Sequence, residues 1–139
     1  MSHEIKQLAI RLHGGFSNNQ FDKVLELCHD DIEVHSYAFG AHFSGKEAFV
    51  NFMQGFKIPF PDVTLHHLNF VVEGNKVAVQ MTANGTHSGP FQTPNGIIPA
   101  TGKTIELFVS EFMVFENGKL ISLHNYQDAG SLMQQIGVM

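Results

Sequence analysis

The sequence has little of several residue types, and each shortage excludes a class of protein. It contains one Cys, Cys28, so no disulfide can form within the chain. A Cys in an apolar helical pattern is typical of a core residue. Lys and Arg together number eight against 13 Asp and Glu, and the basic residues do not cluster. We therefore expect neither nucleic acid nor an anionic membrane as a partner.

Long hydrophobic runs are also missing. No apolar run approaches membrane-spanning length, and the polar, periodic N-terminus does not resemble a signal peptide. We therefore expect a cytoplasmic protein. The composition that remains is globular, because 43% of the residues are apolar, only 15% are charged and 13 are Phe. The length suits a single domain over residues 1–139.

The hydrophobic pattern predicts helices first and most of the strands afterwards. Apolar residues at helical spacing predict a helix over residues 5–16, and residues 21–28 predict a second, shorter one. Residues 31–37 have the pattern of a strand. A third helix is expected to begin at Ser44, with Glu47 completing a capping box. Helices segregated from antiparallel strands indicate an α+β fold.

Two hairpins are expected in the second half of the chain. Their turns are Gly74-Asn75 and Asn117-Gly118, both flanked by strand-like segments. Residues 88–103, between the hairpins, are rich in Gly and Pro and predict a loop that either covers a pocket or protects a sheet edge. A short helix is expected from residue 129 to Gly137.

Strand pairing across the second turn brings two proton-handling side chains together. A two-residue turn sets Glu116 opposite Lys119, and counting outward sets Glu111 opposite His124. A bulge would change this count beyond its position. A carboxylate and an imidazole beside apolar neighbours such as Met113 are typical of acid–base sites. We therefore interpret Glu111 and His124 as an acid–base pair.

The first hairpin has one face that is far more apolar than the other. That face includes Phe70, Leu68 and His66 on one strand and every second residue from Val77 to His87 on the other, so we assign it to the core. His87, at the end of this face, is expected at the mouth of any cavity. His35 is either a core histidine or a site residue. The histidines expected at the surface are His3, His13, His29 and one of the pair His66 and His67.

Three segments resemble the SnoaL-like polyketide cyclase family of the nuclear transport factor 2-like superfamily. They are "FPDVTLHHLNFVVEGNKVAVQMTANGTHSGPF", "PATGKTIELFVSEFMVFENGKLIS" and "DAGSLMQQIG". The resemblance implies a cone-shaped α+β barrel, in which a curved, mostly antiparallel sheet wraps around N-terminal helices and encloses a pocket. It also implies chemistry without a cofactor and a homodimer packed through the outer sheet face. Members include polyketide cyclases, steroid isomerase-like enzymes, dehydratases and epoxide hydrolases.

The resemblance also assigns roles to positions. The polar residue on the first strand of the cyclases falls at His35, and a His of their third long strand falls at Glu111. The acid–base Asp of the cyclases falls at Asn125, and Asn does not exchange a proton at neutral pH. A later Asp is retained as Asp128. From the residues alone, Asp128 is as well suited to capping the helix that follows it as to a pocket.

These observations predict a small enzyme that acts by cofactor-free proton transfer on a hydrophobic, carbonyl-bearing small molecule. Glu111 and His124 would exchange the proton, and His35 and Asp128 would assist. No spacing typical of metal ligands occurs, so no metal site is predicted. The alternative is a non-catalytic small-molecule-binding or dimerising domain of the same fold. The residues expected to contact the ligand are His87, Asn125, Tyr126, Phe52, Phe56 and Met113.

Overall fold

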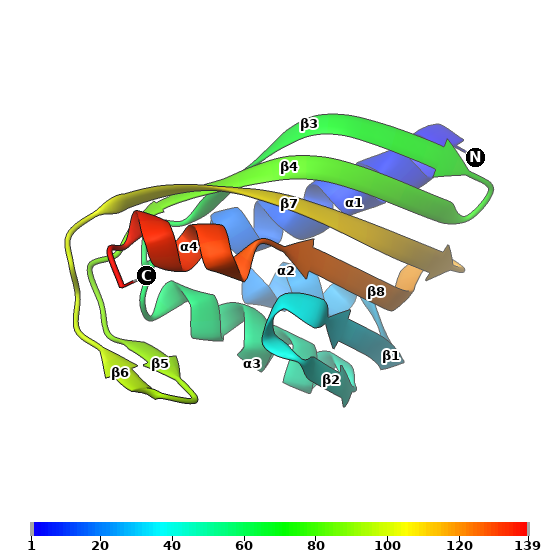
Figure 1. Ribbon diagram of the computed structural model, residues 1–139. Coiled ribbons are helices and arrows are strands. Elements are labelled where there is room, and N and C mark those ends of the chain that lie inside the picture. The colour runs from blue at the N-terminus through cyan, green and yellow to red at the C-terminus, as the bar shows by residue number, and fades with distance from the viewer. Residues whose placement is uncertain (1, 139) are drawn as a thin grey trace.

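A computed structural model describes residues 2–138, and its elements confirm the α+β class (Figure 1). No helix among these residues is long and apolar enough to cross a membrane. In chain order the elements are α1 (Ser2–Ser17), α2 (Phe21–Glu26), β1 (Cys28–Ser36), the 3-10 helix η1 (Tyr37–Phe39), β2 (Ala41–Ser44), α3 (Lys46–Lys57), β3 (Thr64–Glu73), β4 (Lys76–Thr86), β5 (Phe91–Thr93), β6 (Gly96–Ile98), β7 (Thr104–Glu116), β8 (Lys119–Gln127) and α4 (Ala129–Gln135).

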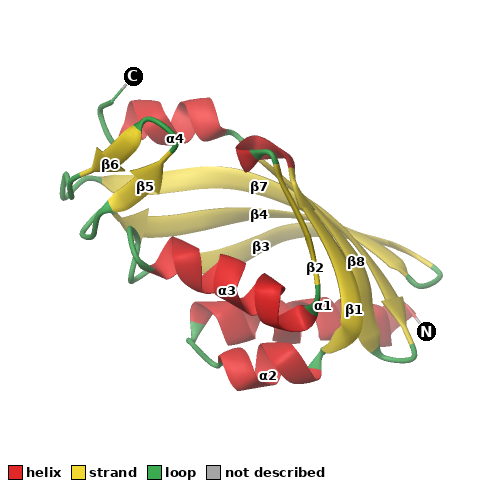
Figure 2. Ribbon diagram, turned by 90° about the horizontal axis from the view of Figure 1, so that it is seen from below, coloured by secondary structure: helices red, strands yellow, loops and turns green. Residues whose placement is uncertain are grey.

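One curved sheet organises the molecule. Its six strands lie in the order β2-β1-β8-β7-β4-β3, and every neighbouring pair is antiparallel except β1 and β8, which run parallel. Helices α1, α2 and α3 lie on one side of the sheet, inside its curve (Figure 2). The core therefore fills the space between the concave sheet face and these helices. Cys28 is buried in that core as expected, but the helix predicted over residues 21–28 ends at Glu26 and Cys28 begins β1.

Both predicted hairpin turns are confirmed, but four short elements were not predicted. These are η1, β2 and the small β5–β6 hairpin within the predicted loop. The predicted capping box at Ser44 is wrong. Ser44 ends β2 and donates its hydroxyl proton to Glu33, whereas Gly45 precedes α3 with a φ of 98°. Residues with a side chain rarely adopt that backbone conformation, so a glycine is favoured at the position directly before the helix.

A bulge in β8 makes the predicted register wrong beyond the first pairs. Glu116 opposes Lys119 and Phe115 opposes Leu120 as expected, but an irregularity follows between Val114 and Phe115. Beyond the bulge, Glu111 opposes Asn125 and Phe112 opposes His124. The physical reason is that Leu120 and Leu123 are both buried although they are three positions apart in the strand. Regular alternation would turn one of these leucines outward, and the extra residue avoids that.

A second bulge, in β3, changes the predicted core face of the first hairpin. His67 opposes Met81 and Asn69 opposes Gln80, so Leu68 is the extra residue and is 59% exposed. His66 is also exposed, whereas His67 and Phe70 are partly buried. The assignment of Leu68 and His66 to the core is therefore wrong. The β4 side of the prediction is confirmed, because Val77, Val79, Met81 and Ala83 are buried.

Candidate active site

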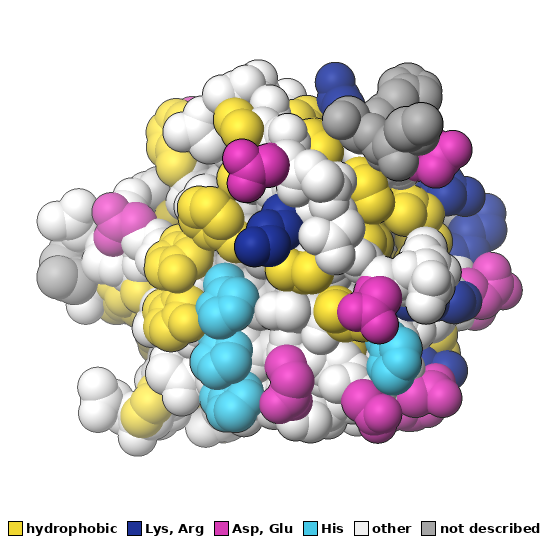
Figure 3. All heavy atoms as spheres, turned by 90° about the vertical axis from the view of Figure 1, so that its right-hand side faces the viewer, with side chains coloured by type: hydrophobic (Ala, Val, Ile, Leu, Met, Phe, Trp, Pro, Cys, Tyr) yellow, Lys and Arg dark blue, Asp and Glu magenta, His cyan; other side chains and the backbone are white. Residues whose placement is uncertain are grey.

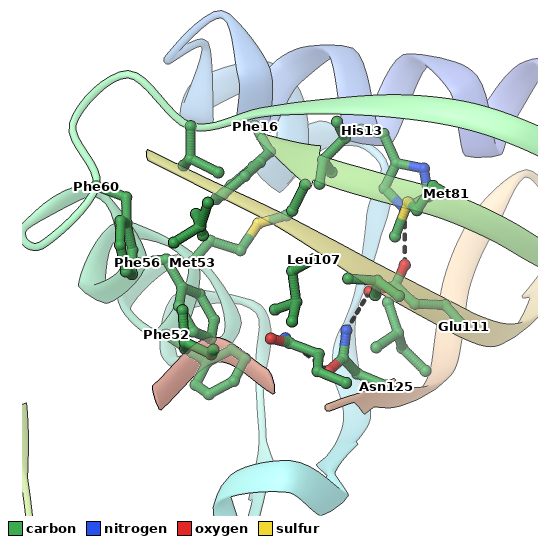
Figure 4. Close-up of a pocket in the computed structure, with 18 of the residues that line it drawn as sticks. His13, Phe16, Phe52, Met53, Phe56, Phe60, Met81, Leu107, Glu111 and Asn125 are labelled. Carbon is green, nitrogen blue, oxygen red and sulfur yellow. Dashed lines mark hydrogen bonds and ion pairs between the residues drawn. The ribbon is translucent and has the colours of Figure 1, made fainter. Parts of the chain in front are cut away.

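A cavity of about 80 Å³ lies between the concave sheet face and helices α1 and α3. Most of its wall is apolar, and only four polar side chains reach it. Figure 4 shows His13 and Glu111 at one end and Phe52, Phe56 and Phe60 at the other. The lining residues are His13, Phe16, Phe49, Phe52, Met53, Phe56, Phe60, Val63, Leu65, Met81, Ala83, Ile105, Leu107, Val109, Glu111, Leu123, Asn125, Gln127 and Leu132.

Glu111 is the central group at the polar end. It lies in β7 and is 8% exposed. Its Oε1 is 2.7 Å from Nε2 of His13, and its Oε2 accepts a hydrogen bond of 2.8 Å from Nδ2 of Asn125. An ionised carboxylate only accepts hydrogen bonds, so Nε2 of His13 carries the shared proton when Glu111 is charged. The pair can therefore hold a proton on either partner in a water-poor environment.

His13 completes this pair from α1, and its predicted surface position is wrong. It is 2% exposed and faces the sheet. The sequence carried a signal for this placement, because His13 lies four residues after Ala9 and three before Phe16, both buried. That spacing places all three on one helical face. His3, another predicted surface histidine, has a side chain outside the described residues, while His29 is exposed.

Asn125 is held in one orientation by its neighbours. Its Oδ1 accepts hydrogen bonds from Nε2 of Gln127 at 2.9 Å and from Oγ of Ser36 at 3.5 Å. An ionised carboxylate only accepts hydrogen bonds, so the amide atom that faces Glu111 is the amino group and Oδ1 faces Gln127 and Ser36. Asn125 therefore acts as a fixed donor to the carboxylate, in the place where the resemblance implies an acid.

His67 lies behind His13, on the side away from the cavity. Nδ1 of His13 and Nε2 of His67 are 2.7 Å apart, and the two rings are tilted by 36°. Burial, and secondarily the neighbouring His13 imidazole, lowers the pKa of His67 to about 4. His67 is therefore neutral at physiological pH. The sequence prediction of one surface histidine in the pair His66 and His67 is confirmed, since His66 is the exposed one.

His124 and His35 lie on the outer face of the sheet, so the predicted pair of Glu111 with His124 is wrong. The ring of His35 stacks on His124 at 4.7 Å and on His42 at 4.0 Å, across three adjacent strands. Figure 3 shows a column of His side chains bordered by hydrophobic ones. The hydroxyl of Tyr37 is 2.8 Å from Nδ1 of His124. Burial and the two flanking imidazoles lower the pKa of His35.

Several other predicted site residues also lie away from the cavity. Asp128 is the N-cap of α4, where Oδ1 accepts a hydrogen bond of 3.0 Å from the backbone N–H of Ser131. Tyr126 is on the outer face, and Met113 is buried but does not line the cavity. His87 is fully buried beside Phe60, with Nδ1 2.9 Å from Oγ1 of Thr101. The predicted residues that line the cavity are Glu111, Asn125, Phe52 and Phe56.

The fold and the cavity together define a class of protein. It is an α+β domain whose curved sheet encloses a small apolar hollow with a hydrogen-bonded carboxylate and imidazole at one end. A sequence model of the SnoaL-like polyketide cyclases matches residues 7–136. The chain therefore belongs to the SnoaL-like polyketide cyclase family. Among the side chains of residues 4–138, no group of three or more His, Cys, Asp or Glu is arranged to hold a metal ion.

Solved structures share this fold at low sequence identity. A SnoaL-like protein from Jannaschia sp. CCS1, described as a candidate polyketide cyclase, is 19% identical with a TM-score of 0.88, covering 99% of this chain and 94% of that one. IdmH from Streptomyces antibioticus, also a candidate polyketide cyclase, is 22% identical with a TM-score of 0.85, covering 96% and 99%. AclR from Streptomyces galilaeus, a candidate hydroxylase, is 21% identical with a TM-score of 0.86, covering 100% and 84%. A search of curated proteins found no match.

Proposed function

We propose that this protein is an enzyme that moves a proton on a hydrophobic, carbonyl-bearing small molecule without a cofactor. The observation that carries this proposal is the hydrogen bond between Glu111 and His13 at the end of an apolar cavity. An ionisable pair in a concave, mostly apolar site is the arrangement that general acid–base chemistry requires. Membership of the SnoaL-like polyketide cyclases supports the same class of reaction.

Glu111 is the group that would exchange the proton. Its carboxylate takes a proton from the carbon next to the substrate carbonyl, and the electron pair of that C–H bond moves into an enolate. The proton then returns to another carbon in an isomerisation, to an alkoxide oxygen in a cyclisation, or to a leaving hydroxyl in a dehydration. In each case the carboxylate is restored, so neither an oxidant nor a reductant is needed.

The polar end of the cavity also supplies donors for the developing negative charge. Asn125 uses one amide hydrogen on Glu111, and Gln127 uses one on Asn125, so each side chain keeps a second hydrogen. Both residues line the cavity. Donors held in place before the reaction stabilise an enolate oxygen without reorganising. A ligand with a single polar end therefore fits, with its carbonyl near Asn125 and its apolar part toward α3.

The size of the cavity implies that the wall moves when a ligand enters. About 80 Å³ is well below the roughly 300–1,000 Å³ of common ligand sites. Phe52, Met53 and Phe56 line the cavity from a single helix, and Phe52 and Phe56 are only partly buried. Met is unbranched and adapts to irregular shapes. Rotation of these side chains would enlarge the hollow at the end opposite Glu111.

Racemisation of one enantiomer of 2-methyl-1-tetralone tests the function. Removal of its only α-proton destroys the stereocentre, which circular dichroism follows directly. We expect the native protein to accelerate this loss, and Glu111→Gln to lower the rate by at least about hundredfold, as for removal of a general base. Glu116→Gln, an exposed change at the end of the same strand, is the matched control. Equal rates for the native protein and Glu111→Gln would contradict the proposal.

The second candidate function is non-catalytic binding of a small molecule. The presence of Asn125, where the resemblance implies an acid, favours it. The same ketone separates the two functions, because a binding protein would show saturable binding by calorimetry while leaving the enantiomer intact. Binding together with Glu111-dependent racemisation would favour the enzyme.

A further inference from the structure

The site continues beyond the cavity through a second histidine. Glu111, His13 and His67 form an unbroken chain with two contacts of 2.7 Å. Glu111 and His13 line the cavity, whereas His67 does not. Glu111 and His13 are buried, and His67 is only partly so. These three contacting side chains therefore lead from the cavity, through His13 of α1, toward the solvent-exposed edge of the sheet.

A bulge in β3 places His67 in contact with His13. β3 is an edge strand, and its bulge at Leu68 lets His67 and Phe70 both face inward. Without the extra residue, residues three apart would point to opposite faces. The ring of His67 packs against Phe70 at 4.9 Å, which fixes its orientation toward His13. Bulges that redirect a side chain are common beside functional sites.

The charged groups around His67 keep it neutral but able to exchange a proton. Burial disfavours a charge on its ring most strongly, followed by His13 and more weakly by His66 on β3 and Lys6 on α1, whereas Glu111 on β7 favours one. A neutral imidazole has one nitrogen that donates and one that accepts. His67 can therefore take a proton from His13 and release one from its other nitrogen.

We propose that His67 is the outer end of a proton relay that connects Glu111 to solvent through His13, which rests on the proposed function of Glu111. A proton moves from the Glu111 carboxyl to Nε2 of His13. The O–H bond breaks as the N–H bond forms, and His13 then passes its Nδ1 proton to Nε2 of His67. His67 releases the proton on its Nδ1 to water. The same steps in reverse deliver a proton to Glu111, so charge is conserved.

The relay matters when a ligand occupies the cavity. An apolar molecule beside Glu111 excludes water from that side, so a proton taken from the ligand can only return to it. A path through the wall of the cavity lets the proton exchange with solvent while the ligand stays bound. His67 is thus a positioning and relay residue that does not contact the ligand.

The direct test is the exchange of His13 imidazole protons with water in the ligand-free protein, measured by NMR with ¹⁵N-labelled histidine. We expect fast exchange in the native protein and exchange at least about tenfold slower in His67→Gln. Gln can still hydrogen-bond to His13 but cannot pass a proton on. His66→Gln, at the exposed neighbour, is the control and should leave exchange unchanged. Equal exchange in the native protein and His67→Gln would overturn the relay, as would slow exchange in both.

A second measurement separates the relay from the proposed function. In D₂O, racemisation of 2-methyl-1-tetralone reports proton removal, and deuterium in the recovered ketone reports exchange with solvent. We expect His67→Gln to incorporate severalfold less deuterium per racemisation event than the native protein. An unchanged ratio would overturn the relay even if Glu111→Gln abolishes racemisation. If Glu111→Gln has no effect, the proposed function fails while the NMR test still decides the relay.

Discussion

Asn125 determines how much charge the polar end of the cavity holds. Its amide donates to Glu111 and is itself fixed by Gln127 and Ser36, so one carboxylate faces one imidazole and one amide. An acid at this position would place two carboxylates in hydrogen-bond contact. The amide distinguishes this protein from relatives that have an Asp there, as the resemblance implies, and leaves Glu111 as the one carboxylate of this hydrogen-bonded group.

Asn125→Asp tests this account of charge. Two carboxylates in contact cannot both ionise cheaply, so the pKa of the introduced acid should be raised in the folded state. A folded-state pKa above the unfolded value lowers stability as pH rises. As the pH is raised from about 4 to 8, we expect the melting temperature of Asn125→Asp to fall relative to that of the native protein. A difference independent of pH would show that the two side chains do not interact.

The positions of single side chains in the cavity were harder to predict from the sequence than the helices and strands that carry them. Glu111 could be placed in a pocket because its apolar strand neighbours and the family pattern both point there. Asn125 was placed there by the family pattern alone, since regular alternation set it on the other face of the sheet and only the β8 bulge brings it opposite Glu111. His13 was missed, although its spacing from Ala9 and Phe16 indicated a buried face, because a polar side chain on a helix is usually assigned to solvent. Its burial depends on Glu111, which lies 98 residues later in the chain, and no local pattern reports such a partner.

At the scale of elements, packing between α1 and α2 depends on one glycine. A Cβ at Gly15 would lie 2.7 Å from Cγ2 of Val24 in α2, whereas a Cβ at Gly14 would meet nothing within 4 Å. Gly costs stability in a helix interior because it loses more backbone freedom on folding. The two neighbouring glycines therefore have opposite roles.

We expect Gly14→Ala to raise the free energy of unfolding by about 0.5–1 kcal/mol, through helix propensity. Gly15→Ala should lower it by about 1–3 kcal/mol, because the methyl group overpacks the contact with Val24. Urea denaturation of both variants measures the difference, and each serves as the control for the other. Stabilisation by both substitutions would mean that α1 and α2 are farther apart than described.

The elements themselves were largely predictable, and the errors come from bulges and short strands. The main helices and both hairpin turns follow from periodicity and turn chemistry. The β8 bulge was not predicted, yet Leu120 and Leu123 carry its signal, since two core leucines three residues apart do not fit regular alternation. β2 was missed because four residues offer too little pattern, and its existence depends on pairing with β1.

At the scale of the whole molecule, the outer face of the sheet retains exposed aromatic rings. Phe108 and Phe112 on β7 are 65% and 55% exposed, and Tyr126 on β8 packs edge-on against Phe112 at 6.0 Å. A cluster of exposed hydrophobic side chains on a folded domain often marks an interface. This face matches the homodimer that the resemblance implies, so we predict that two copies associate through it.

Sedimentation velocity tests this association. We expect a dimer for the native protein and a monomer for Phe112→Lys, because a buried lysine without a partner opposes the interface. Ile97→Lys is the matched control, since Ile97 is similarly exposed but lies in the β5–β6 hairpin. A monomeric native protein, or a Phe112→Lys variant that remains dimeric, would be inconsistent with this interface.

The most direct measurement of the central claim is the racemisation rate of 2-methyl-1-tetralone across a double-mutant cycle of Glu111→Gln and His13→Gln. If the two side chains act as one acid–base unit, the double variant should be no slower than the slower single variant. Losses that multiply independently, or rates unaffected by either substitution, would contradict the assignment of chemistry to this pair.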